Sequence, residues 1–182
     1  MTKHFWGKTT SMRILAANLA LLILASCATL TESQCQTDDW FEIGKSDGAR
    51  GRPLDFIFEH AKACNEFGIA PKAEPWRAGR IEGLKTYCTP RNAYNIGQRG
   101  QKLSPVCTGD NLSRLQTANM RGIRWHRVSR EIRDVERDIR EINAALSELA
   151  SDDPARVSLV SERSFLRLDI LTLRAEQARY RF

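Results

Sequence analysis

The chain has 182 residues, with 28 Lys and Arg against 22 Asp and Glu, and a formal net charge of +6. Hydrophobic residues make up 42% and charged residues 27%, which is an ordinary globular composition. This length allows one modest domain, alone or with an appendage, and excludes a barrel enzyme of ordinary size. The composition argues against a polytopic membrane protein and against a wholly disordered chain, and it points to no activity.

The first 26 residues have the pattern of a secretory signal. Lys3, Lys8 and Arg13 occur there without any acid, and a 12-residue, mainly apolar run follows at 14–25. As a helix, this run would span about 18 Å, whereas the hydrocarbon core of a bilayer is about 30 Å thick. A cleaved signal is therefore favoured over a permanent transmembrane helix.

The apolar run ends in Leu24-Ala25-Ser26-Cys27, which resembles a bacterial lipobox. In lipoproteins the signal is cut before this cysteine, which then carries a diacylglycerol and an amide-linked chain such as palmitate. Two or more acyl chains anchor a protein stably. We expect residues 1–26 to be removed and Cys27 to hold the protein in a membrane. The alternative is a plain secretory signal with an incidental cysteine.

The residue after Cys27 is Ala28 and not Asp. By resemblance to Gram-negative lipoproteins, this predicts the outer membrane, with the protein facing the periplasm. Without the signal, 25 basic residues remain against 22 acids, a net charge of +3. We therefore expect no nucleic-acid partner, on grounds of both charge and compartment.

Four further cysteines suggest two disulfides, as in other short exported chains. Three connectivities are possible. We favour Cys35–Cys64 with Cys88–Cys107, each stabilising the fold by roughly 3 kcal/mol. The competing interpretation is a metal site, but the chain has no CxxC pair and only His60 lies close to a cysteine. We expect no metal and no cofactor.

The composition divides the chain behind the signal. Residues 27–34 are expected to form a polar tether. Residues 35–108 contain the four cysteines, eight of the eleven glycines and five of the six prolines, which predicts a compact, turn-rich module. Residues 110–182 contain only Gly122 and Pro154 of these two residue types, which favours long helices.

The module is predicted to be helical, because β-branched residues are scarce in it. The second of four expected helices has Pro53 at its start and Gly68 at its end, and the fourth follows the cap Thr89-Pro90. The four helices are expected at about 35–46, 54–67, 74–87 and 90–100.

An aromatic residue precedes two glycines at helical spacing three times in the module. A glycine inside a helix costs up to about 1 kcal/mol against alanine, so three such placements need a reason. Close crossing of helices is the simpler explanation, and a bare backbone that admits a ligand is the alternative. The three sets are Trp40/Gly44/Gly48, Trp76/Gly79/Gly83 and Tyr94/Gly97/Gly100.

A sustained heptad pattern begins after the module and predicts a helix over about 112–150. A second helix over about 154–179 would fold back as an antiparallel, coiled-coil-like hairpin. The apolar stripe of this second helix is wider than the surface that the first helix could cover. We expect Val157, Val160, Leu168 and Leu171 on one edge to be buried as well as Leu159, Leu166, Ile170 and Leu173 on the other. The heptad residues are Trp125, Val128, Ile132, Val135, Ile139, Ile142, Leu146 and Leu149.

The excess stripe predicts a contact, with either the first module, a second copy or a partner helix, through residues 125–173. The 110–182 segment has 14 Arg, no Lys and 12 acids. This balance favours a solvated, salt-bridged surface over a site for anionic partners such as lipopolysaccharide.

The module resembles an uncharacterised family of small proteobacterial lipoproteins. The resemblance covers residues 27–107 and implies a cysteine-linked periplasmic module, without an activity or catalytic residues. It rests on a Cys-Trp-Ile-Gly-Asp-Gly-Gly-Arg-Pro order between Cys35 and Pro53, on His60, Cys64, Gly68 and Pro71, and on a Gly-Arg-Gly-Leu-Tyr-Cys-Thr-Pro order between Gly79 and Pro90.

Few side chains suggest chemistry. His60 shares the apolar face of its helix and is expected to be a satisfied core histidine. Asp47, Arg52 and Arg80 lie next to glycine turns, and a structural ion pair among them is favoured over binding of an anionic ligand. No nucleophile, zinc or phosphate-loop motif occurs, so no catalytic residue is assigned.

These features predict an all-α, lipid-anchored envelope protein that acts by binding or as a structural element, without catalysis. Its hairpin would serve as the interaction surface. The alternative is a small-ligand-binding protein or a hydrolytic enzyme centred on His60, Asp47 and Arg80.

Overall fold

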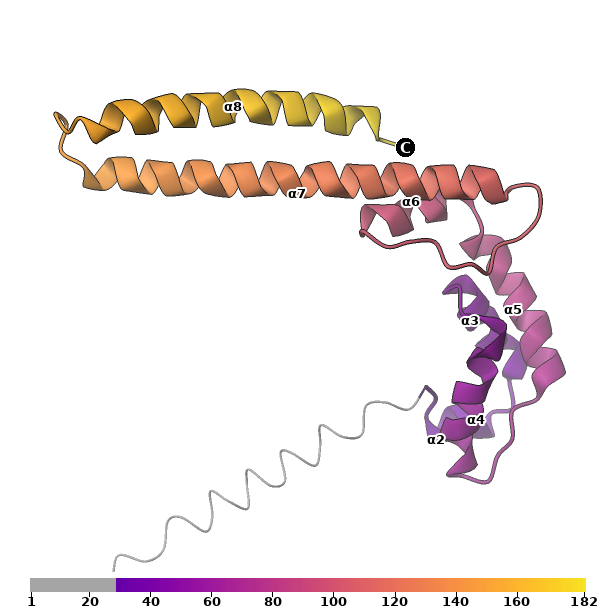
Figure 1. The fold of residues 1–182 in the computed structure, drawn as a ribbon. Helices are drawn as coiled ribbons and strands as arrows, with labels where there is room; N and C mark the ends of the chain where they lie inside the picture. The colour runs from indigo at the N-terminus through magenta and orange to yellow at the C-terminus, as the bar shows by residue number, and fades with distance from the viewer. Residues whose placement is uncertain (1–28) are drawn as a thin grey trace, which may run out of the picture.

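A computed structural model describes residues 29–182, and every regular element in this part of the chain is a helix. The predicted all-α fold is therefore confirmed. The expected signal peptide and Cys27 lie outside the described residues. Figure 1 shows a short column of helices whose upper end meets a long helical hairpin, which lies across the column. Below, the column is called the stem.

The stem begins with two short helices where one had been expected at 35–46. These are α2 (Glu32–Gln36) and α3 (Trp40–Ala49). The chain turns sharply at Asp38, whose φ is 58°. Asp39 then caps α3 by accepting a hydrogen bond from the backbone N–H of Glu42. This cap starts a new helix and so prevents a continuous one.

The remaining short helices lie close to their predicted positions. A 3₁₀ turn, η1 (Leu54–Phe56), leads into α4 (Ile57–Asn65), and α5 spans Ala73–Tyr87. Helix α6 (Pro90–Gln98) begins at the predicted cap, because the Thr89 hydroxyl accepts from the Asn92 N–H.

Glycines allow α3 and α5 to touch backbone to backbone in the stem. A methyl group on Gly44 or Gly48 would overlap the backbone carbonyl of Trp76 or Arg80. In return, Gly79 and Gly83 of α5 lie against the carbonyls of Phe41 and Lys45. The close-crossing explanation of the aromatic–glycine pattern is thus confirmed for its first two sets.

The third set has a different partner. Gly97 of α6 lies against the carbonyl of Asn119, and Gly122 of the next helix lies against the carbonyl of Tyr94. Gly122 stood outside the predicted pattern, because it belongs to the C-terminal segment. This second crossing connects the short helices to the hairpin.

The four cysteines form the expected pairs, Cys35–Cys64 and Cys88–Cys107. Each disulfide belongs to its own core. The first core contains both tryptophans of the stem and the second surrounds α6. Because Leu115 and Ala118 belong to the second core, the packing continues across the boundary that was expected at 108–110.

The hairpin consists of α7 (Leu112–Glu148) and α8 (Ala155–Arg179). At 1.5 Å per residue, the 37 residues of α7 span about 55 Å. All eight predicted heptad residues of α7 are buried or half-buried. Polar bonds fix the antiparallel register, among them Gln177 to Ser129 at 2.7 Å and Arg163 to Asn143 at 2.9 Å.

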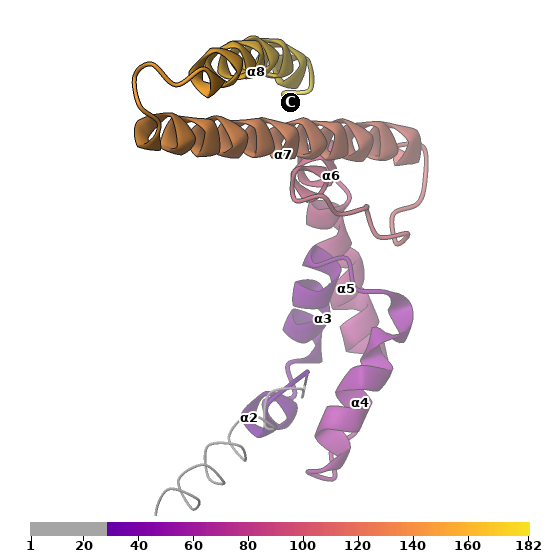
Figure 2. The same ribbon diagram turned by 60° about the vertical axis from the view of Figure 1, so that its left-hand side comes forward.

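Only one edge of the apolar stripe on α8 meets α7. Ile170 is buried, and Leu159, Leu166 and Leu173 are half-buried. The other edge, which was expected to be buried as well, is exposed: Val157 is 76%, Leu168 61% and Leu171 62% accessible. Figures 1 and 2 agree that α8 lies on the side of α7 opposite α6 and the stem, so no other helix among residues 29–182 covers this edge.

The described part of the expected tether packs against the stem. Leu30 is buried with the first core, and Thr31 caps α2. The Thr29 hydroxyl donates to the carbonyl of Glu59 on α4 at 3.1 Å. From Thr29 onward, the chain is therefore fixed to the foot of the stem, the end away from the hairpin.

Candidate functional site

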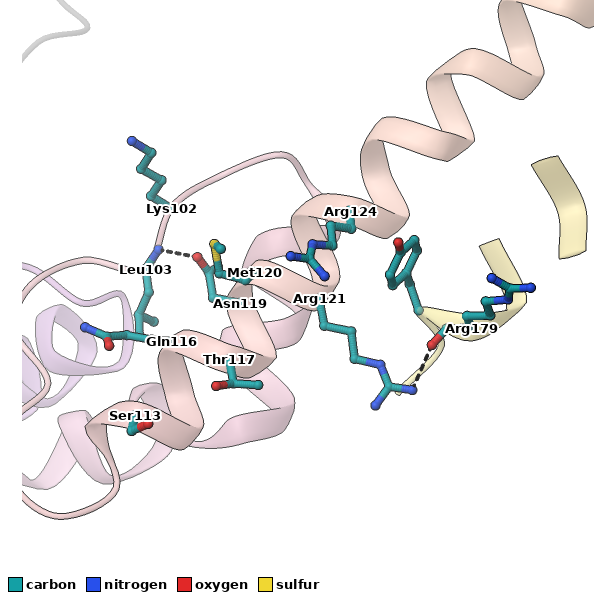
Figure 3. A pocket seen from close by; sticks show the side chains of 11 residues that line it. Lys102, Leu103, Ser113, Gln116, Thr117, Asn119, Met120, Arg121, Arg124 and Arg179 are labelled. Atoms are coloured by element: carbon teal, nitrogen blue, oxygen red, sulfur yellow. Dashed lines mark hydrogen bonds between the residues drawn. The ribbon is translucent and has the colours of Figure 1, made fainter. Parts of the chain in front are cut away.

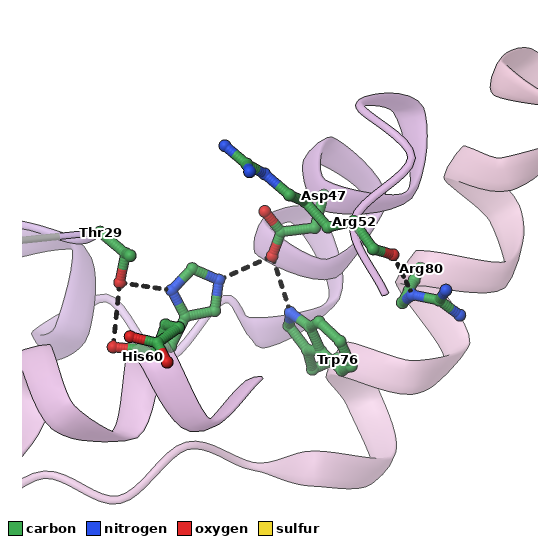
Figure 4. Close-up of polar contacts among 7 residues, drawn as sticks. Thr29, Asp47, Arg52, His60, Trp76 and Arg80 are labelled. Carbon is green, nitrogen blue, oxygen red and sulfur yellow. Dashed lines mark hydrogen bonds and ion pairs between the residues drawn. The ribbon is translucent and has the colours of Figure 1, made fainter. Parts of the chain in front are cut away.

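Two of the four predicted ligand-binding residues meet in a buried polar cluster between α3, α4 and α5 (Figure 4). Nε2 of His60 lies 2.6 Å from Oδ2 of Asp47, and the Trp76 indole donates to the same oxygen at 2.9 Å. His60 is 2% accessible and Asp47 3%. On its other side, Nδ1 of His60 lies 2.9 Å from the Thr29 hydroxyl.

Counting donors shows how this cluster is bonded. The single proton of the Thr29 hydroxyl points to the Glu59 carbonyl, which can only accept. Nδ1 of His60 then donates to Thr29, and one proton is shared between Nε2 of His60 and Oδ2 of Asp47. A buried polar pair needs such complete hydrogen bonding to offset its desolvation.

The other two predicted residues play different parts. The Arg80 side chain is 9% accessible and donates from Nε to the carbonyl of Arg52 at 2.8 Å. Burial lowers the pKa of Arg80, while the nearby charges of Asp47 and Asp55 oppose this shift. The Arg52 guanidinium lies over the Phe56 ring at 4.4 Å. The ion pair expected among Asp47, Arg52 and Arg80 is thus replaced by one between Asp47 and His60.

This geometry limits what the cluster can do chemically. A hydroxyl, an imidazole and a carboxylate in a row also occur in nucleophilic enzymes, where the imidazole accepts the hydroxyl proton. Here the Thr29 hydroxyl donates to the Glu59 carbonyl, so the imidazole does not accept its proton. A cavity of about 170 Å³ adjoins Asp47 and His60, which is below the usual size of ligand pockets.

A larger concave site lies where the hairpin meets α6, and the sequence reasoning missed it. This basic groove has a volume of about 790 Å³ and lies between the first third of α7, the segment after α6 and the end of α8 (Figure 3). Its lining contains four cationic side chains and no carboxylate: Lys102, Arg121, Arg124 and Arg179.

A sequence signal for the groove does exist. The average charge of 110–182 is nearly balanced, but the balance is uneven along the hairpin. Residues 111–130 contain five Arg and no acid, whereas 131–148 contain three Arg and six acids. The expected salt-bridged surface is found at Arg127, which contacts Glu131 and Glu176, whereas Arg121 and Arg124 have no such partner among residues 29–182.

Within residues 29–182, no three His, Cys, Asp or Glu side chains gather where they could hold a metal ion. No helix in this part of the chain is long and apolar enough to cross a membrane. Cys27, the predicted lipidation site, precedes the first described residue by two positions.

The observed features define an all-helical, disulfide-linked protein with a small stem and a long hairpin. Residues 39–124 match the model of a family described as a protein of unknown function, DUF2799. The match extends past the expected limit at residue 107 and spans both glycine crossings. No curated protein and no solved structure matched the chain.

Proposed function

We propose that this protein is held at the outer membrane through acylated Cys27, faces the periplasm, and acts by binding another envelope protein. The observation that carries the proposal is the unpartnered face of α8. It supports a binding role for the hairpin, whereas Asp47 and His60, the centre of the alternative enzyme hypothesis, are paired with one another.

The unpartnered face of α8 follows a second heptad pattern, separate from the one that contacts α7. Seven uncharged residues recur at alternating steps of four and three, and all are exposed. Such spacing is typical of helices that pack along their length. We call this face the α8 seam; it consists of Val157, Ser161, Ser164, Leu168, Leu171, Ala175 and Ala178.

The direction of the α8 seam indicates the kind of partner. The seam is on the face of α8 opposite α7, and α8 is on the side of α7 opposite the stem. Thr29, two residues after Cys27, is fixed at the foot of the stem. A partner therefore approaches from the side away from the anchor.

A second copy fits this direction poorly. If it docked on the α8 seam through its own seam, its foot and its anchor would point away from those of the first copy. Two copies in one membrane leaflet cannot meet in this way. We therefore propose an apolar, heptad-patterned helix of a different envelope protein as the partner.

Site-specific photocrosslinking in cells tests this proposal. A photoreactive residue in place of Leu168, on the α8 seam, is expected to give one crosslinked species with a protein of different sequence. The same residue in place of Glu141, which is exposed on α7, serves as the matched control and is expected to give none.

Two outcomes would contradict the proposal. A crosslink from position 168 to a second copy, together with a dimeric mass by light scattering, would assign the seam to self-association. The absence of any crosslink from position 168, in a protein that is correctly anchored, would show that the seam has no protein partner.

A further inference from the structure

We infer that the basic groove binds a phosphate-bearing ligand, a function separate from that proposed for the α8 seam. The groove gathers four cationic side chains and no carboxylate on one concave surface. No ion pair within 4.0 Å connects Lys102, Arg121, Arg124 or Arg179 to a carboxylate in residues 29–182.

One cation of α7 outside the groove is neutralised instead. Arg137 lies within 4.0 Å of three carboxylates, those of Asp134, Asp138 and Glu141. These contacts raise the pKa of Arg137. Four cations that share a concave surface without acids repel one another, and an anion in the groove would relieve this repulsion.

Two of the guanidinium groups are held in position. Nη2 of Arg121 donates to the Arg179 carbonyl at 3.2 Å, and the Arg124 guanidinium lies 5.9 Å from the centre of the Tyr180 ring. Figure 3 shows both side chains between α7 and the end of α8. Neither contact uses up the five N–H donors that a guanidinium carries.

Neutral donors complete the recognition of a phosphate. The side chains of Ser113, Gln116 and Thr117 line the same groove from the first two turns of α7. A phosphate monoester carries nearly two negative charges and three acceptor oxygens, so it matches several cations and hydroxyls at once. A single carboxylate would leave most of the four charges uncompensated.

The groove is also built on a rigid support and has apolar surface. The Asn119 amide donates to the carbonyls of Ala93 and Gln101, and its oxygen accepts from the Leu103 N–H, which fixes the segment after α6 against α7. Leu103 and the 56%-exposed Met120 provide the apolar part of the lining. The volume suits a phosphate that carries a sugar or a short acyl portion.

Titration calorimetry of the detergent-solubilised full chain tests the inference. Inorganic pyrophosphate is the soluble probe, and dihexanoyl phosphatidic acid is the lipid probe, with the phosphatidylcholine of the same chain length as its neutral control. We expect phosphate-dependent binding that weakens with added salt. Tighter binding of the lipid would identify a headgroup as the source, and tighter binding of pyrophosphate a soluble compound.

Matched variants assign the binding to the groove. The double variant Arg121→Gln/Arg124→Gln is expected to weaken pyrophosphate binding at least tenfold. The control Arg137→Gln/Arg140→Gln removes the same charge from α7 outside the groove and is expected to change binding less than twofold. Thr117→Phe fills the groove while it keeps every charge, so it reports on the site even if the double variant unfolds.

Three results would overturn the inference. The first is that pyrophosphate does not bind the unaltered protein. The second is that the control pair loses as much affinity as the groove pair. Equal affinity for sulfate at the same ionic strength would show a general anionic surface effect. Crosslinking at position 168 does not involve the groove, so failure of this inference and failure of the proposed partner are distinguishable.

Discussion

The Asp47 carboxylate lies 2.6 Å from Nε2 of His60 and is contributed by a different helix, α3 rather than α4. The same oxygen accepts from Trp76 of α5 at 2.9 Å. One carboxylate oxygen therefore joins three helices of the stem.

Removal of the Asp47 charge is expected to destabilise the stem. Asp47→Asn replaces the buried carboxyl partner of His60 and Trp76 with a neutral amide, which should lower the free energy of unfolding by about 3 kcal/mol. Urea unfolding followed by circular dichroism measures the loss. The control Asp55→Asn changes an exposed carboxylate and should stay within about 0.5 kcal/mol of the unaltered protein. Equal stability of the two variants would refute the buried pair.

The α3–α5 crossing should not tolerate a single methyl group. Gly48→Ala would press its side chain into the Arg80 carbonyl, so the helices must separate. We expect a loss of about 3 kcal/mol or more, comparable to severe overpacking. Ser46→Ala, two positions earlier on an exposed face of α3, is the control and should be nearly neutral. Thermal melts of both variants would decide, and unchanged melting of Gly48→Ala would disprove the close contact.

The Cys88–Cys107 disulfide closes the loop that carries α6 against α7. The paired change Cys88→Ser/Cys107→Ser should cost about 3 kcal/mol, given the sequence separation of 19. Adding a reductant to this variant should then affect only the other disulfide, Cys35–Cys64. Denaturant titrations under oxidising and reducing conditions measure both effects. If reduction leaves the stability of the unaltered protein unchanged, the disulfides do not contribute as expected.

Membrane attachment should depend on one sulfur atom. Cys27→Ser is expected to abolish incorporation of labelled palmitate and to move the protein from the detergent phase to the aqueous phase on phase separation. Cys35→Ser, which removes a cysteine of the stem, should retain the label. Palmitate on the Cys27→Ser protein would contradict the assignment of the anchor.

Two positions of α8, one exposed and one buried, should differ in how strongly an introduced charge lowers the stability. Leu168→Glu changes an exposed residue of the α8 seam and should alter stability by less than about 0.5 kcal/mol, while it abolishes the crosslink to the partner from a photoreactive residue at Leu171 of the same seam. Ile170→Glu places a carboxylate against α7 and should cost at least 2 kcal/mol, roughly the penalty for an unpaired buried charge. Unfolding curves distinguish the two, and a strongly destabilised Leu168→Glu would mean that the seam is covered.

Sequence periodicity predicted those parts of the fold that rest on regular spacing. The heptads of α7 identified its packed face, and the aromatic–glycine sets identified helices that cross closely. The spacing could not reveal which helix each glycine meets. Gly97 pairs with Gly122, 25 residues away, because the Cys88–Cys107 loop returns the chain to α6.

Polar sites were predicted less completely. His60 was expected to be a satisfied core residue, and it is, but its bond to Asp47 depends on how α3 and α4 pack. The basic groove was missed because total charge was considered and its distribution was not. The groove is also lined by Lys102 and Tyr180, which are far apart in the sequence, so no local sequence pattern predicts that they lie together.

The hydrogen bond between Thr29 and the Glu59 carbonyl of α4 has a mechanical consequence. At about 3.5 Å per residue, no more than roughly 7 Å of chain separates Cys27 from the first fixed residue. If Cys27 is acylated, the stem stands on the bilayer without slack, and the hairpin works as a rigid lever arm. A force that a bound partner applies to α8 would then be transmitted through the glycine crossings and the stem to the lipid anchor in the membrane.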